Sequence, residues 1–118
     1  MSKVTNINGS NIKPIKLTNN VDVPFVICFK DKLTKGYTFE DLEKINNKEL
    51  QNFLNIVSQL SVTEVDKKYR RKTDKEDKYQ GQQVFHYQVS DSFRIHVINY
   101  NGSYEVIRLD PNHKVHNK

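Results

Sequence analysis

Cysteine, glycine and long apolar runs are scarce in this chain of 118 residues, and each scarcity excludes a class of protein. The single cysteine, Cys28, has no second thiol to pair with, so we expect no disulfide partner and a reducing, cytoplasmic compartment. The four glycines form no Gly-rich phosphate loop. The longest apolar run, residues 25–29, is far too short to cross a bilayer, and no apolar leader follows Met1. We therefore expect neither a membrane partner nor a signal peptide.

Motifs for metal binding and for covalent catalysis are also absent. The chain has no C-x-x-C, H-E-x-x-H or G-x-S-x-G spacing, and its four histidines include no helical i, i+4 pair. A metal site would have to combine His86, His96 and His113, with Asp110 as a further ligand. The sequence therefore predicts no metal site and no other cofactor.

Positive charge exceeds negative charge, with a formal net charge of +5 and a pI of about 9.3. Such a balance favours polyanionic partners. Fifteen of the nineteen basic residues are lysine, and asparagine is abundant. Because both residues have A/T-rich codons, the position of the charge is more informative than its total. It is densest in the run KKYRRK, which contains Lys67, Lys68, Arg70, Arg71 and Lys72.

Two interpretations of this run remain open. Most charge runs are solvated helix ends and loops, which need no ligand. The alternative is a phosphate-binding patch, since arginine makes bidentate contacts with phosphate that lysine cannot make. The pattern alone does not distinguish them.

The first part of the chain predicts an arm, a strand and two or three helices. Residues 1–20 show no periodicity and are expected to form a flexible arm, followed by a single domain over residues 21–118. Residues 21–30, VDVPFVICFK, predict a strand whose apolar run is buried on both faces. Thr38 and Asp41 form a capping box for a short helix to Ile45, ended by Asn46-Asn47, which cap the next helix. That helix has one apolar stripe: Leu50, Phe53, Leu54, Val57 and Leu60. Ser61 and Glu64 form a second capping box.

The C-terminal part predicts three antiparallel strands. Asn101-Gly102 indicates a two-residue type I′ turn that pairs Val97 with Val106 and leaves Ile95 opposite Arg108. A three-residue loop at 90–92 sets the other register, which places His86 across from His96. One face is then apolar and suits the helix stripe: Phe85, Tyr87, Val89, Phe93, Ile95, Val97 and Val106. The other face carries His86, Gln88, Arg94, His96 and Ile98, with Ile107 and Leu109 beyond.

This polar face is sufficient for RNA cleavage without a metal. Histidine titrates near neutral pH and moves the protons, and arginine or lysine stabilises the charge on phosphorus. The competing interpretation is that His86 and His96 are inert strand residues, His96 standing between two apolar neighbours. His113 follows Pro111 in a polar segment, so burial is not expected there.

The order of the predicted elements, together with PFVICFK, FRIHVI and the ending RLDPNHKVH, resembles the RelE/ParE superfamily of bacterial toxins, in particular its HigB-like and YafQ-like members. The resemblance covers residues 21–116. It implies an α+β fold with a helical hairpin on one face of a twisted antiparallel sheet. It also implies a type II toxin that cleaves mRNA at the ribosome and is neutralised by a cognate antitoxin.

The resemblance also implies roles for individual residues. The family's basic residue on a central strand corresponds to Arg94, and its C-terminal histidine or tyrosine corresponds to His113. With His86 and His96, these are the candidate catalytic residues. The candidate RNA contacts are Lys67, Lys68, Arg70, Arg71, Lys72, Arg108 and Lys114. Two features depart from the family pattern: the long N-terminal arm and the histidine at position 96. A non-catalytic binding protein on the same scaffold, such as a ParE-like gyrase inhibitor or a phage- or defence-associated module, stays as the alternative.

Overall fold

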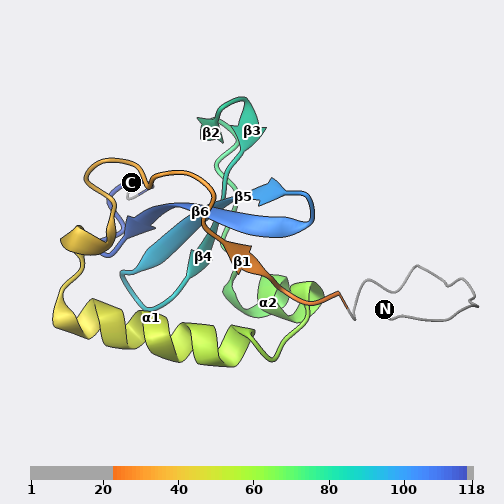
Figure 1. The fold of residues 1–118 in the computed structure, drawn as a ribbon, viewed down its shortest axis with the longest axis horizontal. Helices are drawn as coiled ribbons and strands as arrows, with labels where there is room; N and C mark the ends of the chain where they lie inside the picture. Colours follow the sequence, from red (N-terminus) through yellow and green to blue (C-terminus); the bar gives the residue numbers. More distant parts are fainter. Residues whose placement is uncertain (1–22, 117–118) are drawn as a thin grey trace, which may run out of the picture.

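The computed structural model describes residues 23–116, so the arm expected over residues 1–20 lies outside the described residues. The fold is α+β, with two helices, a mixed four-stranded sheet in the order β1-β6-β5-β4, and a separate two-stranded sheet, β2-β3 (Figure 1). The elements are β1 (Ile27–Cys28), a 3-10 turn η2 (Phe39–Asp41), α1 (Lys44–Val57), α2 (Val62–Tyr69), β2 (Lys78–Tyr79), β3 (Gln82–Gln83), β4 (Phe85–Gln88), β5 (Arg94–Tyr100) and β6 (Ser103–Asp110). Neither of these helices is long and apolar enough to span a membrane.

The first strand differs from the prediction in length and in burial. β1 has two residues and lies parallel to β6 at an edge of the sheet, with Ile27 opposite Tyr104. Val26 is 45% exposed and Phe29 is 55% exposed, so the expectation of a strand buried on both faces is wrong. An unbroken apolar run does not identify an edge strand, because one of its faces can remain open while only the other packs on the core.

The sequence predicted three helix boundaries, and two of them, the capping boxes at Thr38 and Ser61, are present in the structure. The Thr38 box with Asp41 is present, but it opens only the single turn η2. Ser61 and Glu64 cap α2 as expected. The predicted break at Asn46-Asn47 is wrong, because α1 runs through it. Glu43 is the N-cap of α1, and the Asn46 side chain accepts a hydrogen bond from the Glu43 backbone at 2.8 Å. Asparagine at this position therefore starts the helix instead of ending it.

Both helices lie on one side of the sheet (Figure 1). Leu50, Phe53 and Val57 of α1 are buried against the sheet face, and α2 adds the fully buried Val65. Leu54 was assigned to the same stripe, but it is 36% exposed and lies at its margin. The apolar sheet face contains the predicted residues, with Phe85 and Val89 partly buried.

The register of the hairpins decides which side chains share the opposite face. β4 pairs with β5 as predicted, with His86 opposite His96. In the β5–β6 pair, Val97 faces Val106 as predicted, but the register shifts between His96 and Val97, as at a β-bulge. The shift places Arg108 opposite His96 and Asp110 opposite Arg94.

This shift corrects two predictions. Arg108 does not face Ile95, which pairs with Leu109 instead. Leu109 joins the core beneath the helices, not the polar face. Ile107 stays on the polar side, in a small separate cluster with Val84 and Ile98. The polar face therefore gains one cation and one carboxylate in exchange for an apolar residue.

Candidate functional site

A cavity of about 550 Å³ lies at the polar face of the sheet, beside the C-terminal tail. Three segments that are distant in the sequence line it. The segment after α2 provides Arg71, Lys72, Thr73, Asp74 and Lys75, the strands provide His86 and Arg94, and the tail provides His113 and His116. Three of the sequence-predicted catalytic residues, His86, Arg94 and His113, therefore meet at one concave surface.

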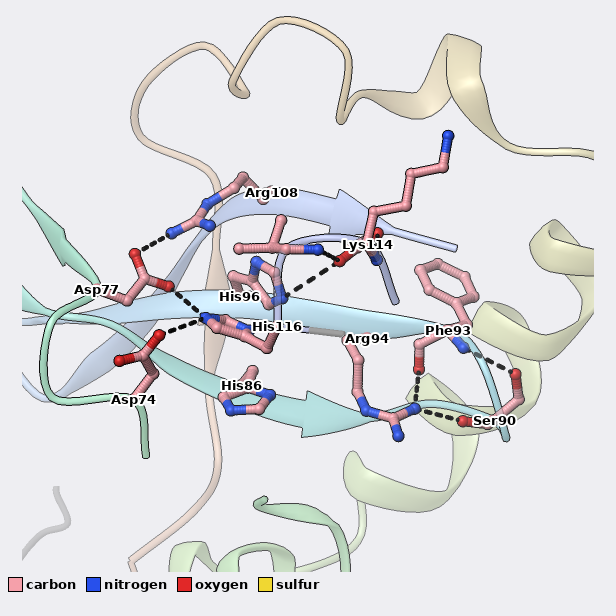
Figure 2. A network of polar contacts seen from close by, with 12 residues as sticks. Asp74, Asp77, His86, Ser90, Phe93, Arg94, His96, Arg108, Lys114 and His116 are labelled. Carbon is pink, nitrogen blue, oxygen red and sulfur yellow. Dashed lines mark hydrogen bonds and ion pairs between the residues drawn. The ribbon is translucent and has the colours of Figure 1, made fainter. Parts of the chain in front are cut away.

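Arg94 is held at this cavity by its own loop. Its Nη1 donates to the backbone carbonyls of Ser90, Asp91 and Phe93 at 2.8, 3.1 and 3.3 Å (Figure 2). Nη2 makes no hydrogen bond to the described residues, and it is not enclosed by them. Burial, and then the positive charge of Arg71, lowers the pKa of Arg94. A guanidinium with so high a normal pKa keeps its charge, so Nη2 is a fixed donor for an anion.

The tail after β6 is shaped by Asp110. Its carboxylate accepts the backbone N–H groups of Lys114 and Val115, each at 2.9 Å. His113 lies in this turn with a positive φ of 52°, which is uncommon for residues other than glycine. Its side chain is half-buried, and burial followed by the charge of Arg94 lowers its pKa. His113 is therefore a neutral imidazole at physiological pH, and the tail holds it at the rim of the cavity.

The other three histidines form a cluster. The rings of His86 and His116 stack with their centroids 4.3 Å apart, and the His96 centroid is 5.0 Å from that of His116 and 5.7 Å from that of His86. His86 Nε2 lies 2.8 Å from the Lys72 carbonyl oxygen, and His116 Nε2 lies 2.8 Å from Asp77 Oδ2. Burial lowers the pKa of His86 and lowers that of His96 to about 2, Arg108 adding to the shift at His96.

Two expected site residues are buried and do not line the cavity. His96 is fully buried and forms no part of the cavity wall, so a substrate in the cavity would not touch it. Arg108 is 9% exposed, and its Nη2 lies 2.7 Å from Asp77 Oδ1 in an ion pair. The expected RNA contact of Arg108 is replaced by a contact that ties β6 to the segment before β2.

The basic run divides into free and engaged residues. Lys67, Lys68 and Lys72 are exposed, and so is Lys114 on the tail. Arg70 pairs with Asp66 at 3.3 Å and lies over the Phe85 ring. Arg71 donates through Nε to Gln88 at 2.5 Å and through its other nitrogens to backbone carbonyls. A shallower surface next to the first cavity is lined by Lys67, Arg70, Arg71 and Lys72, with Asp66 and Thr73.

His116 is the residue that the sequence analysis missed. The sequence analysis assigned it no role, and the metal site considered there combined His86, His96 and His113 with Asp110. The described residues instead bring His116 into the group with His86 and His96. Asp74 and Asp77 are the residues whose charge could have pointed to a histidine partner such as His116. They are far from His116 in the sequence, so the contact could not be predicted from a local pattern.

Comparisons with family models, with curated protein sequences and with solved structures found no match to this chain. The likeness to RelE/ParE toxins therefore stays an expectation. The roles assigned below rest on the cavity and on the residues around it.

Proposed function

We propose that the cavity binds single-stranded RNA and cleaves it without a metal, by attack of a ribose 2′-hydroxyl on the adjacent phosphorus. The observation that supports this proposal is the meeting of His113, Arg94 and His86 with Lys72 around one cavity. An imidazole beside fixed cations provides the proton transfer and the charge stabilisation that this reaction needs.

In this mechanism His113 is the group that moves the proton. Its neutral ring takes the proton of the 2′-hydroxyl as the 2′-oxygen attacks phosphorus. The negative charge that develops on the phosphorane oxygens is stabilised by Arg94 Nη2 and by the Lys72 ammonium. The bond from phosphorus to the 5′-oxygen then breaks, and the imidazolium of His113 returns the proton to that oxygen. The products are a 2′,3′-cyclic phosphate and a 5′-hydroxyl.

We place this reaction in a RelE-like toxin that acts on mRNA at the ribosome. Lys72 lines the cavity, Lys67 lines the shallower surface beside it, and Lys68 is exposed on the same run. These lysines would contact phosphates of mRNA or ribosomal RNA. A cognate antitoxin would neutralise the protein.

The test is induced expression in bacteria with sequencing of RNA ends, followed by cleavage of an RNA oligonucleotide by the purified protein. His113→Ala is compared with Asn112→Ala, which changes the exposed neighbouring residue. We expect the first variant to lose about 10²- to 10⁴-fold in cleavage rate and the second to keep it. Mass spectrometry should show a 2′,3′-cyclic phosphate. Equal cleavage by wild type and His113→Ala would remove the assigned role, and a wild type that neither arrests growth nor cuts RNA would refute the nuclease.

A second candidate is a non-catalytic binding protein on this scaffold. The observation that favours it is the engagement of Arg71, all three of whose side-chain nitrogens donate to protein atoms. Such an arginine supports structure more than it serves a reaction. Under this alternative, wild type and His113→Ala arrest growth or bind their target equally, with no new RNA ends.

A further inference from the structure

The three-histidine cluster lies at the junction of the sheet and the tail, and two of its members, His86 and His116, also line the cavity of the proposed RNA site. Each of His86, His96 and His116 offers one ring nitrogen, and these three atoms lie within 4.8 Å of one another. The residues come from β4, from β5 and from the tail. His86 is 5% exposed, His96 is fully buried, and the His116 side chain is 8% exposed. The three rings therefore converge away from bulk water (Figure 2).

The nitrogens of these rings have different surroundings. The Nε2 atoms of His86 and His116 are held by the Lys72 carbonyl and by Asp77. The Nδ1 atoms of both rings, and both nitrogens of His96, are buried without a hydrogen-bond partner among the described residues. Buried polar atoms in folded proteins nearly always have a partner, so this group of open nitrogens needs an explanation.

We propose that His86, His96 and His116 form a binding site for one divalent transition-metal ion of the Zn²⁺ type, which fastens the C-terminal tail to the sheet. Histidines that bind a metal usually donate their other ring nitrogen to a carboxylate or a backbone carbonyl, which fixes the tautomer and the ring direction. Here Asp77 contacts Nε2 of His116, and the Lys72 carbonyl contacts Nε2 of His86. The inference goes beyond the proposed function, whose chemistry uses His113 and Arg94 and no metal.

The geometry fits after a small adjustment. Zn–N bonds of roughly 2.0–2.1 Å in a tetrahedral site place ligand nitrogens about 3.3 Å apart, closer than the 4.8 Å limit of this group. The rings of His86 and His116 stack at an interplanar angle of 29°, so one ring must rotate to direct its lone pair at the ion. His116 is the one that can move, because it lies on the tail beyond Pro111, whereas the other two are on paired strands.

The surroundings favour an ion with an open coordination position. His86 and His116 also line the cavity, so a water from the cavity can complete the tetrahedron. Asp74 lies 3.8 Å from His116 Nε2 and Asp110 Oδ2 lies 3.9 Å from His96 Nε2, whereas the charge of Asp77 is shared with Arg108. Three imidazoles suit Zn²⁺, Cu²⁺, Ni²⁺ or Fe²⁺, whereas Mg²⁺ and Ca²⁺ prefer oxygen ligands. Mg²⁺ is therefore the negative control.

The consequence concerns His113, which lies between Asp110 and His116 on the same tail. Without an ion, this tail depends on the Asp110 turn and on the His116–Asp77 contact. A bound ion adds a second attachment three residues after His113, and so fixes the position of that ring at the cavity.

The experiment uses the full chain without a polyhistidine tag, dialysed against EDTA and then titrated with ZnCl₂, with CoCl₂ as a spectroscopic probe. The variants are His116→Gln and, as matched control, His113→Gln, a histidine of the same tail outside the cluster. We expect one Zn²⁺ per wild-type chain, a tetrahedral Co²⁺ absorption band, and a Tm raised by about 5 °C or more by Zn²⁺ but not by Mg²⁺. His113→Gln should match wild type in zinc stoichiometry, in the Co²⁺ band and in the rise of Tm with Zn²⁺, whatever it loses in RNA cleavage.

His116→Gln should bind Zn²⁺ more weakly by about 100-fold or more, since loss of an outer partner alone costs roughly 10- to 100-fold. Asp77→Asn, which changes such an outer partner, should weaken zinc binding by about 10- to 100-fold. Circular dichroism checks that the variants are folded, and His116 on the tail is the least disruptive ligand to change. Equal zinc affinity of His116→Gln and His113→Gln, or no stoichiometric zinc in wild type, overturns the site. RNA cleavage is measured separately on the EDTA-treated protein. Zinc binding without cleavage refutes only the nuclease, and cleavage without zinc binding refutes only the metal site.

Discussion

Asp77 and His116 are 39 positions apart in the sequence, yet Asp77 Oδ2 and His116 Nε2 lie 2.8 Å apart. The other oxygen of Asp77 lies 2.7 Å from Arg108 Nη2. One carboxylate therefore joins the segment before β2, the last strand and the tail, and it is 13% exposed. The segment and the tail both line the cavity, so this residue supports the site without lining it.

Replacing this carboxylate tests that role. Asp77→Asn leaves Arg108 without its anion in a largely buried place, and we expect a loss of about 2 kcal/mol in the free energy of unfolding. Asp74→Asn is the matched control. Its carboxylate is 36% exposed and 3.8 Å from the same ring, so its loss should be less than about 0.5 kcal/mol. Urea unfolding of the EDTA-treated proteins measures both, and equal losses would contradict the structural role of Asp77.

The sequence predicted the parts of the fold that depend on local chemistry. Asn101 and Gly102 both have positive φ, as the predicted turn requires, and the alternation from Phe85 to Val97 set the register of β4 and β5. The capping boxes of η2 and α2 were predicted from their residue types and spacing. All of these features depend on contacts between residues that are close together in the sequence.

The features that were missed depend on distant contacts. The register shift at His96 and Val97 moves Arg108 and Leu109 to new faces, and no turn residue in the sequence predicts this shift. The exposure of Val26 and Phe29 beside β1 depends on the position of β1 at the edge of the sheet. Arg94 and His113 were assigned from the resemblance to RelE/ParE toxins, and the predicted register also placed Arg94 on the polar face. His116 could not be assigned in this way, because its place depends on Asp77.

The core stripe of α1 provides a second test. Val57 is 2% exposed and Leu54 is 36% exposed, although the sequence pattern treats the two alike. Val57→Ala should lower the free energy of unfolding by about 2 kcal/mol, since it leaves a cavity under the helix. Leu54→Ala should lower it by less than about 1 kcal/mol, because the removed atoms are partly in water already. Urea unfolding at neutral pH measures both. A larger loss at Leu54 would show that α1 is rotated from the position described.

Tyr87 provides a prediction in alkaline solution. Its hydroxyl donates to Asp66 Oδ1 at 2.6 Å, and burial followed by this carboxylate raises its pKa well above the usual 10.0. The folded protein keeps the proton while the unfolded chain loses it above pH 10. The stabilisation is therefore complete below pH 10 and is lost as the pH rises beyond it, at up to about 1.4 kcal/mol per pH unit.

Tyr87→Phe removes this titration. We expect the variant to be less stable at pH 8 by about 1 kcal/mol, the value of the lost hydrogen bond, and to lose less stability between pH 10 and pH 11.5 than wild type. Tyr100→Phe serves as the control, since Tyr100 is 40% exposed and its hydroxyl makes no hydrogen bond among the described residues. Urea unfolding across the pH range provides the curves. Parallel curves for wild type and Tyr87→Phe would contradict the account.

Arg94→Lys tests the proposed anion site while keeping the charge. Lysine cannot contact three carbonyls of its own loop and also present a second donor to the cavity, because its ammonium is a single point at the end of a flexible chain. If Nη2 stabilises the phosphorane, the variant should lose about 10²-fold in the rate of RNA cleavage, the usual effect of removing one preorganised donor. Arg70→Lys is the control, because Arg70 pairs with Asp66 and does not line the first cavity. Cleavage of one RNA oligonucleotide at fixed salt measures both variants. If Arg94→Lys cleaves as fast as Arg70→Lys, the phosphate charge is stabilised elsewhere, and Lys72 becomes the residue to change next.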